Sequence, residues 1–101
     1  HMTVQATLKQ SASAAEIKQR FTEFYADQPF VTVVDGTPRL KDVVGTNHSQ
    51  IGIAVNGNAL VVFCTIDNLV KGAAGGALQW MNRLLGLPET SGLEAAAPGW
   101  L

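Results

Sequence analysis

One stretch of sequence decides the fold: Ile51-Gly52-Ile53-Ala54-Val55-Asn56-Gly57-Asn58-Ala59-Leu60-Val61-Val62-Phe63-Cys64-Thr65-Ile66. It contains two apolar runs, at 51–55 and 59–66, with the turn sequence Asn56-Gly57-Asn58 between them. Asn-Gly supplies the positive φ values that a tight hairpin turn needs, so the stretch predicts a β-hairpin. The second run is apolar on both faces, which is typical of a central strand covered on both sides. We therefore expect it in the middle of a sheet.

Two further strands are predicted before the hairpin. Residues 3–9 alternate between polar and apolar side chains, which is the period of a half-buried strand. Residues 30–34 form an apolar β-branched run that Asp35-Gly36 closes. We expect residues 42–46 to run extended into a loop at 47–49.

Two helices are predicted. Ser13 and Glu16 form a capping box, so a helix should begin at Ser13 and end at about Asp27, just before Gln28-Pro29. A second helix is expected over residues 69–86, with Gly86 in the left-handed position after its end and Pro88 blocking continuation. Its apolar positions fall on one stripe: Ala74, Ala77, Leu78, Met81, Leu84 and Leu85.

The order of these elements predicts one α+β domain with a mostly antiparallel sheet of about four to five strands and two main helices. Residues 1–2 (His1-Met2) read as a tag remnant, residues 3–88 as the domain, and residues 89–101 as an irregular tail. Leu93 or Trp100 is expected to pin this tail to the domain.

Composition excludes several classes of function. The chain has 101 residues, of which 47% are hydrophobic and 15% charged, and its net charge of −1 gives no reason to expect nucleic acid or an acidic membrane as a partner. It contains no apolar stretch long enough to span a membrane. Its one cysteine, Cys64, excludes an internal disulfide or a cysteine zinc cluster, so we expect no metal site and a reducing, cytoplasmic location. The low charge suggests a surface that other protein covers.

Three glycines at the start of the second helix, Gly72, Gly75 and Gly76, need an explanation. Each costs a helix up to about 1 kcal/mol relative to alanine. One explanation is the close approach of a ligand to a helix start, where free N–H groups favour anions. The other is tight packing against a neighbouring segment, and the sequence leaves both open.

Polar residues around these glycines are the candidate site residues. Lys71 could face a substrate phosphate or carboxylate, or it could be an exposed or salt-bridged lysine. Asp67 and Asn68 are expected to cap the helix. Cys64 lies inside a buried-strand pattern, unlike the exposed, electropositive setting of a nucleophilic cysteine, so it reads as structural. His48 reads as a loop histidine rather than a catalyst.

The run Ile66-Asp67-Asn68-Leu69-Val70-Lys71-Gly72-Ala73-Ala74-Gly75, continued by Gln79, Met81, Asn82 and Gly86-Leu87, resembles the C-terminal signature of the N-acetyl-gamma-glutamyl-phosphate reductase family. Tyr25 with residues 29–31, and then residues 44–47, also resemble blocks of that family in the right order. The resemblance covers nearly all of residues 3–93. Its Lys-Gly-Ala-Ala core is shared with the related semialdehyde dehydrogenases.

The resemblance implies a part of an enzyme that reduces an acyl phosphate to an aldehyde with NADPH in arginine biosynthesis. It implies a partial catalytic and dimerisation domain, with the cysteine nucleophile, the histidine and the Rossmann cofactor domain all upstream of Thr3. We therefore expect no catalytic residue in this chain, no cofactor bound by it alone and no activity of the isolated chain.

The resemblance also implies which residues lie near substrate or cofactor: Lys71, Gly72, Gly75, Gly76 and Asn82. At position 76 the family usually has Gln or Asn, and Trp80 replaces a common asparagine. These departures put direct transfer of cofactor contacts in question, whereas Asn82 matches the family.

The expected partners are the missing Rossmann domain and a second copy of this chain, because the apolar stripe of the last helix would otherwise be exposed. In a dimer, that helix could be exchanged between chains. Two alternatives to the reductase segment remain: a non-catalytic α+β interaction module, and a fragment of a related semialdehyde dehydrogenase.

Overall fold

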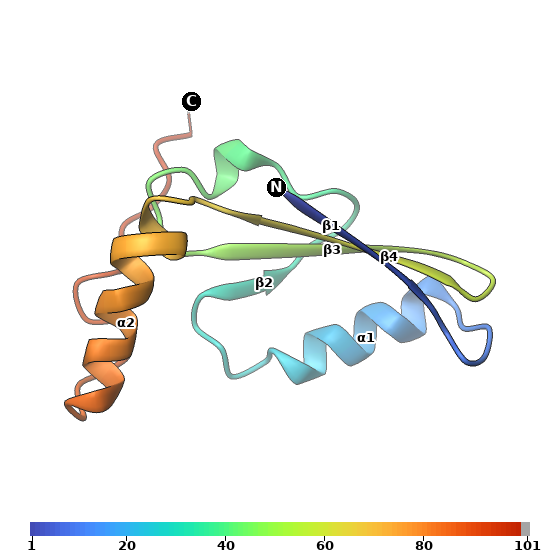
Figure 1. The fold of residues 1–101 in the computed structure, drawn as a ribbon, viewed down its shortest axis with the longest axis horizontal. Coiled ribbons are helices and arrows are strands. Elements are labelled where there is room, and N and C mark those ends of the chain that lie inside the picture. Colours follow the sequence, from blue (N-terminus) through green and yellow to red (C-terminus); the bar gives the residue numbers. More distant parts are fainter. Residues whose placement is uncertain (100–101) are drawn as a thin grey trace.

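The computed structural model describes residues 1–99. Four strands form one sheet in the order β1-β4-β3-β2; one helix lies along the sheet and the other lies beyond one end of it (Figure 1). The elements are β1 (Met2–Thr7), α1 (Ala14–Phe24), β2 (Val31–Val33), β3 (Ser49–Asn56), β4 (Ala59–Ile66) and α2 (Gly75–Leu84), with a 3₁₀ turn η1 (Leu40–Asp42) and a π-helical turn η2 (Val70–Ala74). The predicted α+β class is confirmed. The molecule is a flat slab, 17 Å across its shortest axis.

The hairpin forms as predicted, and β4 lies inside the sheet between β1 and β3. Asn56 pairs with Ala59, so Gly57 and Asn58 are the central residues of the turn. Gly57 has a φ of 62°, and it is the only residue of the turn with a positive φ. A glycine with positive φ at the first central position is typical of a type II′ hairpin turn.

The prediction of a mostly antiparallel sheet was wrong, because the sheet is mixed. β1 and β3 both pair antiparallel with β4, but β2 pairs parallel with β3. Parallel neighbours need a crossover connection, and residues 34–48 supply it across one face of the sheet. A Cβ at Gly52 would stand 2.0 Å from the carbonyl oxygen of Gly36, so the crossover packs directly on a strand position that lacks a side chain.

The crossover also corrects the expectation for residues 42–46. This segment is not extended: it follows the 3₁₀ turn η1 and continues in turns, with the amide of Thr46 donating to the carbonyl of Val43 at 3.0 Å. Compact turns let the crossover reverse direction within a few residues. Val43 of the crossover belongs to the apolar core with Phe30, Ile51, Leu60 and Leu93, and the crossover's polar side chains Thr46 and Asn47 are buried as well.

Coverage of β4 on both faces was expected and is only partial. The register aligns the apolar side chains of the hairpin on one face: Ile51, Ile53, Val55, Leu60 and Val62. α1 lies along this face at the hairpin end (Figure 1), where Leu60 is buried, whereas Ala54 on the opposite face is exposed. Most side chains of β4 are therefore half-buried.

The first helix begins with the predicted capping box. The backbone N–H of Glu16 donates to Ser13 Oγ at 3.1 Å, and the N–H of Ser13 donates to the Glu16 carboxylate at 2.9 Å. These contacts hold the pKa of Glu16 below its usual value, mainly through the backbone hydrogen bond. The helix ends at Phe24, three residues before the predicted end.

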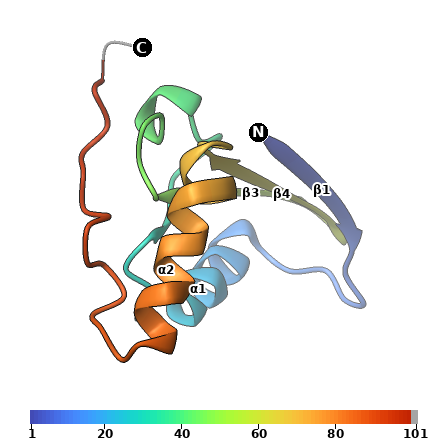
Figure 2. The same ribbon diagram turned by 60° about the vertical axis from the view of Figure 1, so that its left-hand side comes forward.

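The tail after α2 runs back along that helix (Figure 2). As far as Gly99 it contains turns but no helix or strand. Leu93 is 7% exposed, which confirms that it pins the tail, while Trp100 lies outside the described residues. At the other end of the chain, Met2 pairs with Cys64 in the sheet, so β1 begins within the two residues read as a tag remnant.

Candidate functional site

Asp67 accepts backbone hydrogen bonds at the start of the C-terminal helical segment. One carboxylate oxygen accepts the backbone N–H of Gly45 at 2.7 Å, and the other accepts those of Leu69 and Val70 at 2.8 and 3.1 Å. These bonds, with that from Gly45 contributing most, hold the pKa of Asp67 below its usual value. The carboxylate thus ties the crossover loop to the helix start. Asn68 instead places Oδ1 3.1 Å from where a Cβ would stand at Gly72.

Packing accounts for Gly75 and Gly76. The segment Val70–Ala74 is a π-helical turn, a wider form that often occurs at functional sites. A Cβ at Gly75 would lie 2.5 Å from Asn47 Oδ1, and one at Gly76 would lie 2.6 Å from the carbonyl oxygen of Lys71. The two glycines therefore let the π turn close and let Asn47 approach the helix.

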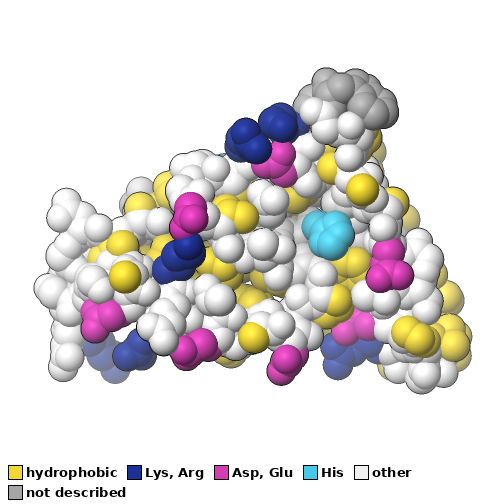
Figure 3. Space-filling view, turned by 180° about the vertical axis from the view of Figure 1, so that it is seen from behind, with side chains coloured by type: hydrophobic (Ala, Val, Ile, Leu, Met, Phe, Trp, Pro, Cys, Tyr) yellow, Lys and Arg dark blue, Asp and Glu magenta, His cyan; other side chains and the backbone are white. Residues whose placement is uncertain are grey.

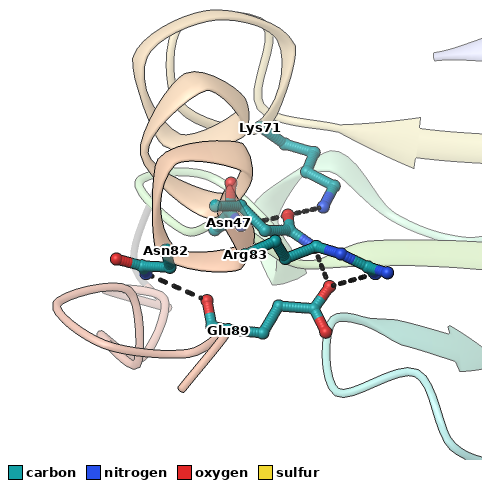
Figure 4. A network of polar contacts seen from close by, with 6 residues as sticks. Asn47, Lys71, Asn82, Arg83 and Glu89 are labelled. Carbon is teal, nitrogen blue, oxygen red and sulfur yellow. Dashed lines mark hydrogen bonds and ion pairs between the residues drawn. The ribbon is translucent and has the colours of Figure 1, made fainter. Parts of the chain in front are cut away.

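Lys71 points from this turn toward α2 rather than into open solvent (Figure 4). Its Nζ donates to Gln79 Oε1 in a very short contact and lies 5.2 Å from the centre of the Phe30 ring. Burial lowers the pKa of Lys71, and the charge of Glu89 partly opposes this shift. Among residues 1–99 no carboxylate forms a direct ion pair with Lys71.

Gln79 is the hub of a polar network that joins three parts of the chain; its partners Asn47, Lys71 and Glu89 are labelled in Figure 4. Its Oε1 accepts Asn47 Nδ2 at 2.9 Å as well as Lys71 Nζ, and its Nε2 donates to Glu89 Oε1 at 2.7 Å. Arg83 Nη1 lies 3.6 Å from the same Glu89 oxygen. Two cations, two amides and one carboxylate thus converge around α2.

The sequence analysis named none of four members of this network as site residues: Asn47, Gln79, Arg83 and Glu89. Gln79 and Arg83 are four residues apart on α2, so their shared face was readable from helical spacing. The contributions of Asn47 and Glu89 depend on how the crossover and the tail fold back, which spacing does not encode.

Asn82 lies on another side of α2 from this network, against the tail. It is 2% exposed, and its Nδ2 donates to the carbonyl oxygens of Glu89 and Ser91 at 3.2 and 3.0 Å. Its amide therefore fixes the backbone of the residue whose side chain enters the network. Asn82 is therefore linked to the network only through the tail backbone and contacts none of its other side chains among the hydrogen bonds described above.

A cavity of about 280 Å³ lies beside the network, and Lys71, Gly76, Gln79, Trp80, Arg83 and Glu89 contribute to its lining. Of the five residues expected near substrate or cofactor, Lys71 and Gly76 meet at this cavity. Gly72 is exposed on the π turn, and Gly75 is buried against Asn47.

The remaining candidates lie outside this cavity. Cys64 is half-buried in β4, and its Sγ lies 3.4 Å from Ser49 Oγ. His48 packs edge-on against Phe30 with a centroid distance of 5.4 Å. Within the described residues no group of three or more histidine, cysteine or acidic side chains could hold a metal ion, and no helix is long and apolar enough to cross a membrane.

Comparison with known proteins relates this chain to one enzyme family. A family model described as "Semialdehyde dehydrogenase, dimerisation domain" matches residues 1–68. An N-acetyl-gamma-glutamyl-phosphate reductase from Rhodopirellula baltica is 56% identical over 69 residues, covering 68% of this chain and 20% of the relative. Reductases of the same name are 44% identical over 100 residues in Heliobacterium modesticaldum and 45% identical over 93 residues in Streptococcus sanguinis.

The two longer alignments cover 93% and 90% of this chain but only 28% and 27% of the relatives. They include the helical segment that carries Lys71, which lies beyond the end of the family match. The chain thus spans between a fifth and just over a quarter of the length of these curated relatives. It belongs to the semialdehyde dehydrogenase dimerisation-domain family, and its curated relatives are N-acetyl-gamma-glutamyl-phosphate reductases, as the resemblance implied.

Proposed function

We propose that this chain is a C-terminal segment of an NADP-dependent enzyme that reduces N-acetyl-gamma-glutamyl phosphate to the semialdehyde in arginine biosynthesis, in the cytoplasm. The observation that carries the proposal is the 44–45% identity to reductases of that name over 90% or more of the chain. In this proposal the nucleophile, the histidine and the Rossmann domain belong to the part of the enzyme outside these residues.

The residues present do not fit a whole dinucleotide. Sites for ligands of drug size usually enclose about 300–1,000 Å³, and the cavity beside Lys71 measures about 280 Å³. Two cations at its wall fit one anionic group of a ligand. Lys71, Gly72, Gly75, Gly76 and Asn82 are proposed to form one edge of the complete site, with Lys71 and Gly76 nearest the ligand and Asn82 acting through the tail.

Self-association is part of the proposal, and surface area supports it. The chain exposes 6565 Å², whereas a monomer of 10.7 kDa typically exposes about 5,500 Å². The excess of roughly 1,000 Å² is of the order that one partner buries in a stable interface, about 800 Å². The matched family is itself described as a dimerisation domain.

Two exposed surfaces are proposed to form this interface. All six residues of β1 are exposed, and β1 is an edge strand of the sheet. On and after α2, apolar side chains are exposed: Trp80, Met81, Leu84, Leu85 and Leu87. Hydrophobic side chains gather over the end of the molecule that α2 forms (Figure 3). These surfaces are proposed to meet the Rossmann domain and a second copy, including a dimer with α2 exchanged.

A chimera tests the proposed activity. Residues 3–93 would replace the matching segment of the Heliobacterium modesticaldum reductase, and oxidation of NADPH with N-acetyl-gamma-glutamyl phosphate would be followed by absorbance. The chimera is expected to be active, and this chain alone is expected to be inactive. A folded, soluble chimera without activity would contradict the proposal, as would activity of the chain alone. The unaltered reductase, purified in parallel, is the control.

A further inference from the structure

The charges around the cavity beside α2 do not balance. Lys71 and Arg83 each contribute a positive charge to its wall, and Glu89 contributes one negative charge. The carboxylate of Glu89 contacts Arg83 at 3.6 Å, whereas the contacts of Lys71 Nζ are with two neutral groups, the amide oxygen of Gln79 and the Phe30 ring. The cavity therefore keeps a net charge of +1, carried by a partly desolvated lysine. A desolvated cation without a paired anion is costly, which favours a further negative group.

The donors around the cavity converge in the way an oxyanion requires. Lys71 Nζ, the guanidinium of Arg83 and Gln79 Nε2 come from η2 and one face of α2 (Figure 4). Gln79 Oε1 accepts from Asn47, which orients Nε2 as the donor end of the amide toward Glu89. Gly76 lines the same space without a side chain, so the cavity stays open between these donors.

Glu89 already shows how an oxyanion sits there. Its Oε1 accepts from Gln79 Nε2 at 2.7 Å and faces Arg83, which are the contacts that an oxygen of a bound phosphate or carboxylate would make. Its backbone carbonyl accepts from Asn82, so the tail delivers the side chain to the cavity. The Glu89 side chain is 24% exposed and has room to turn outward.

We propose that this cavity is a binding site for one small oxyanion, a phosphate or carboxylate group, held by Lys71, Arg83 and Gln79, and that Glu89 is its built-in competitor. When an oxyanion enters, the Glu89 carboxylate leaves Gln79 and Arg83 and moves into solvent. This inference rests on the proposed function, because it names the chemical class of the ligand group at the cavity that Lys71 and Gly76 line. Phosphate binding is measured without the reductase reaction, so failure of one proposal can be told from failure of the other.

Titration with inorganic phosphate tests the site. The backbone and side-chain amide signals of ¹⁵N-labelled protein would be followed by NMR at constant ionic strength, with Gln79 Nε2 as the direct reporter. Acetate in a parallel titration distinguishes a preference for phosphate from a preference for carboxylate. Glu89→Gln keeps the shape of the competitor and removes its charge, so it should bind phosphate about three- to tenfold more tightly than the unaltered chain.

Two variants remove the donors. Lys71→Met and Arg83→Gln should each weaken phosphate binding at least about fivefold, as expected for loss of a charge-assisted hydrogen bond. Lys41→Met removes an exposed lysine that pairs with Asp42 and is the matched control, expected to change nothing. Circular dichroism checks that each variant folds. If Lys71→Met does not fold, Arg83→Gln still tests the proposal.

Three results would overturn the proposal. One is Glu89→Gln binding phosphate no more tightly than the unaltered chain. Another is Arg83→Gln binding as well as Lys41→Met. The third is phosphate shifting signals at all basic residues alike without saturating at Gln79. Saturable shifts at Gln79, strengthened by Glu89→Gln and weakened by Arg83→Gln, support it.

Discussion

Replacing Asn82 by alanine should detach the tail that carries Glu89. The side chain is 2% exposed, and its amide nitrogen donates to two tail carbonyls at 3.2 and 3.0 Å. A hydrogen bond of this kind contributes about 0.5–1.5 kcal/mol net, so Asn82→Ala should cost about 2 kcal/mol of the free energy of unfolding. For a domain of this size that corresponds to a fall in Tm of about 8–16 °C.

Detachment of the tail should also expose Leu93. Leu93 is 7% exposed, and burial of a leucine side chain contributes about 1.5–3 kcal/mol, part of which is lost if the tail detaches. Urea unfolding followed by tryptophan fluorescence measures the total. Hydrogen exchange of the amides of Ser91 and Leu93, which donate within the tail at 3.0 and 2.9 Å, measures the local opening.

Two further variants separate hydrogen bonding from side-chain volume. Asn82→Asp keeps the size but turns an acceptor toward two carbonyl oxygens, so it should lose at least as much stability as Asn82→Ala. Asn56→Ala removes the same atoms from an exposed position at the end of β3 and should stay within about 0.5 kcal/mol of the unaltered chain. If Asn82→Ala lowered the free energy of unfolding no more than Asn56→Ala does, the argument that Asn82 holds the tail in place would be refuted.

Four other predictions concern the crossover, the helix cap, the buried lysine and the surface of α2. Gly52→Ala should lower the free energy of unfolding by at least about 2 kcal/mol in urea titrations, because its Cβ would stand 2.0 Å from a backbone oxygen of the crossover. The pKa of Asp67 is lowered in the folded chain, so its contribution to stability is present above its unfolded pKa and is lost as pH falls through the lowered pKa. Thermal unfolding measured against pH should therefore show Tm falling at acid pH, and Asp67→Asn should make this fall (the acid limb) less steep. Lys71 also has a lowered pKa, so its charge opposes folding at neutral pH. This cost should fade as pH rises from the lowered pKa toward 10.5, so the free energy of unfolding should rise over that range. Lys71→Met should abolish this rise. Leu84, which is 80% exposed, should support self-association; Leu84→Glu should lower the mass found by light scattering.

Three of these predictions, those for Gly52, Asp67 and Leu84, have a matched comparison. Ala54→Ser changes an exposed position on the strand that carries Gly52 and should be nearly neutral. Asp35→Asn neutralises an exposed acid that pairs with Lys18 instead of with backbone N–H groups, and it should leave the effect of Asp67 in place. Gln19→Glu adds the same charge to α1 as Leu84→Glu adds to α2, and association should persist. A clean monomer of the unaltered chain at high concentration would contradict self-association altogether.

The sequence by itself determined the features that depend on neighbouring residues. The capping box at Ser13, the Asp67 cap and the turn at Gly57 each arise from groups within a few residues of one another, so the pattern carries the full information. The predicted strand and helix segments and the family resemblance were also readable, because they rest on runs of side chains.

Only the tertiary structure decided how distant segments meet. β2 is parallel to β3, and the crossover between them packs on Gly52; no periodicity in either strand encodes that arrangement. Lys71 and Gln79 were visible as parts of a motif, but Asn47 and Glu89 reach them through a crossover and a returning tail. Such contacts depend on which surfaces are left uncovered once the local elements have formed. That is a property of the assembled chain rather than of any one stretch of it.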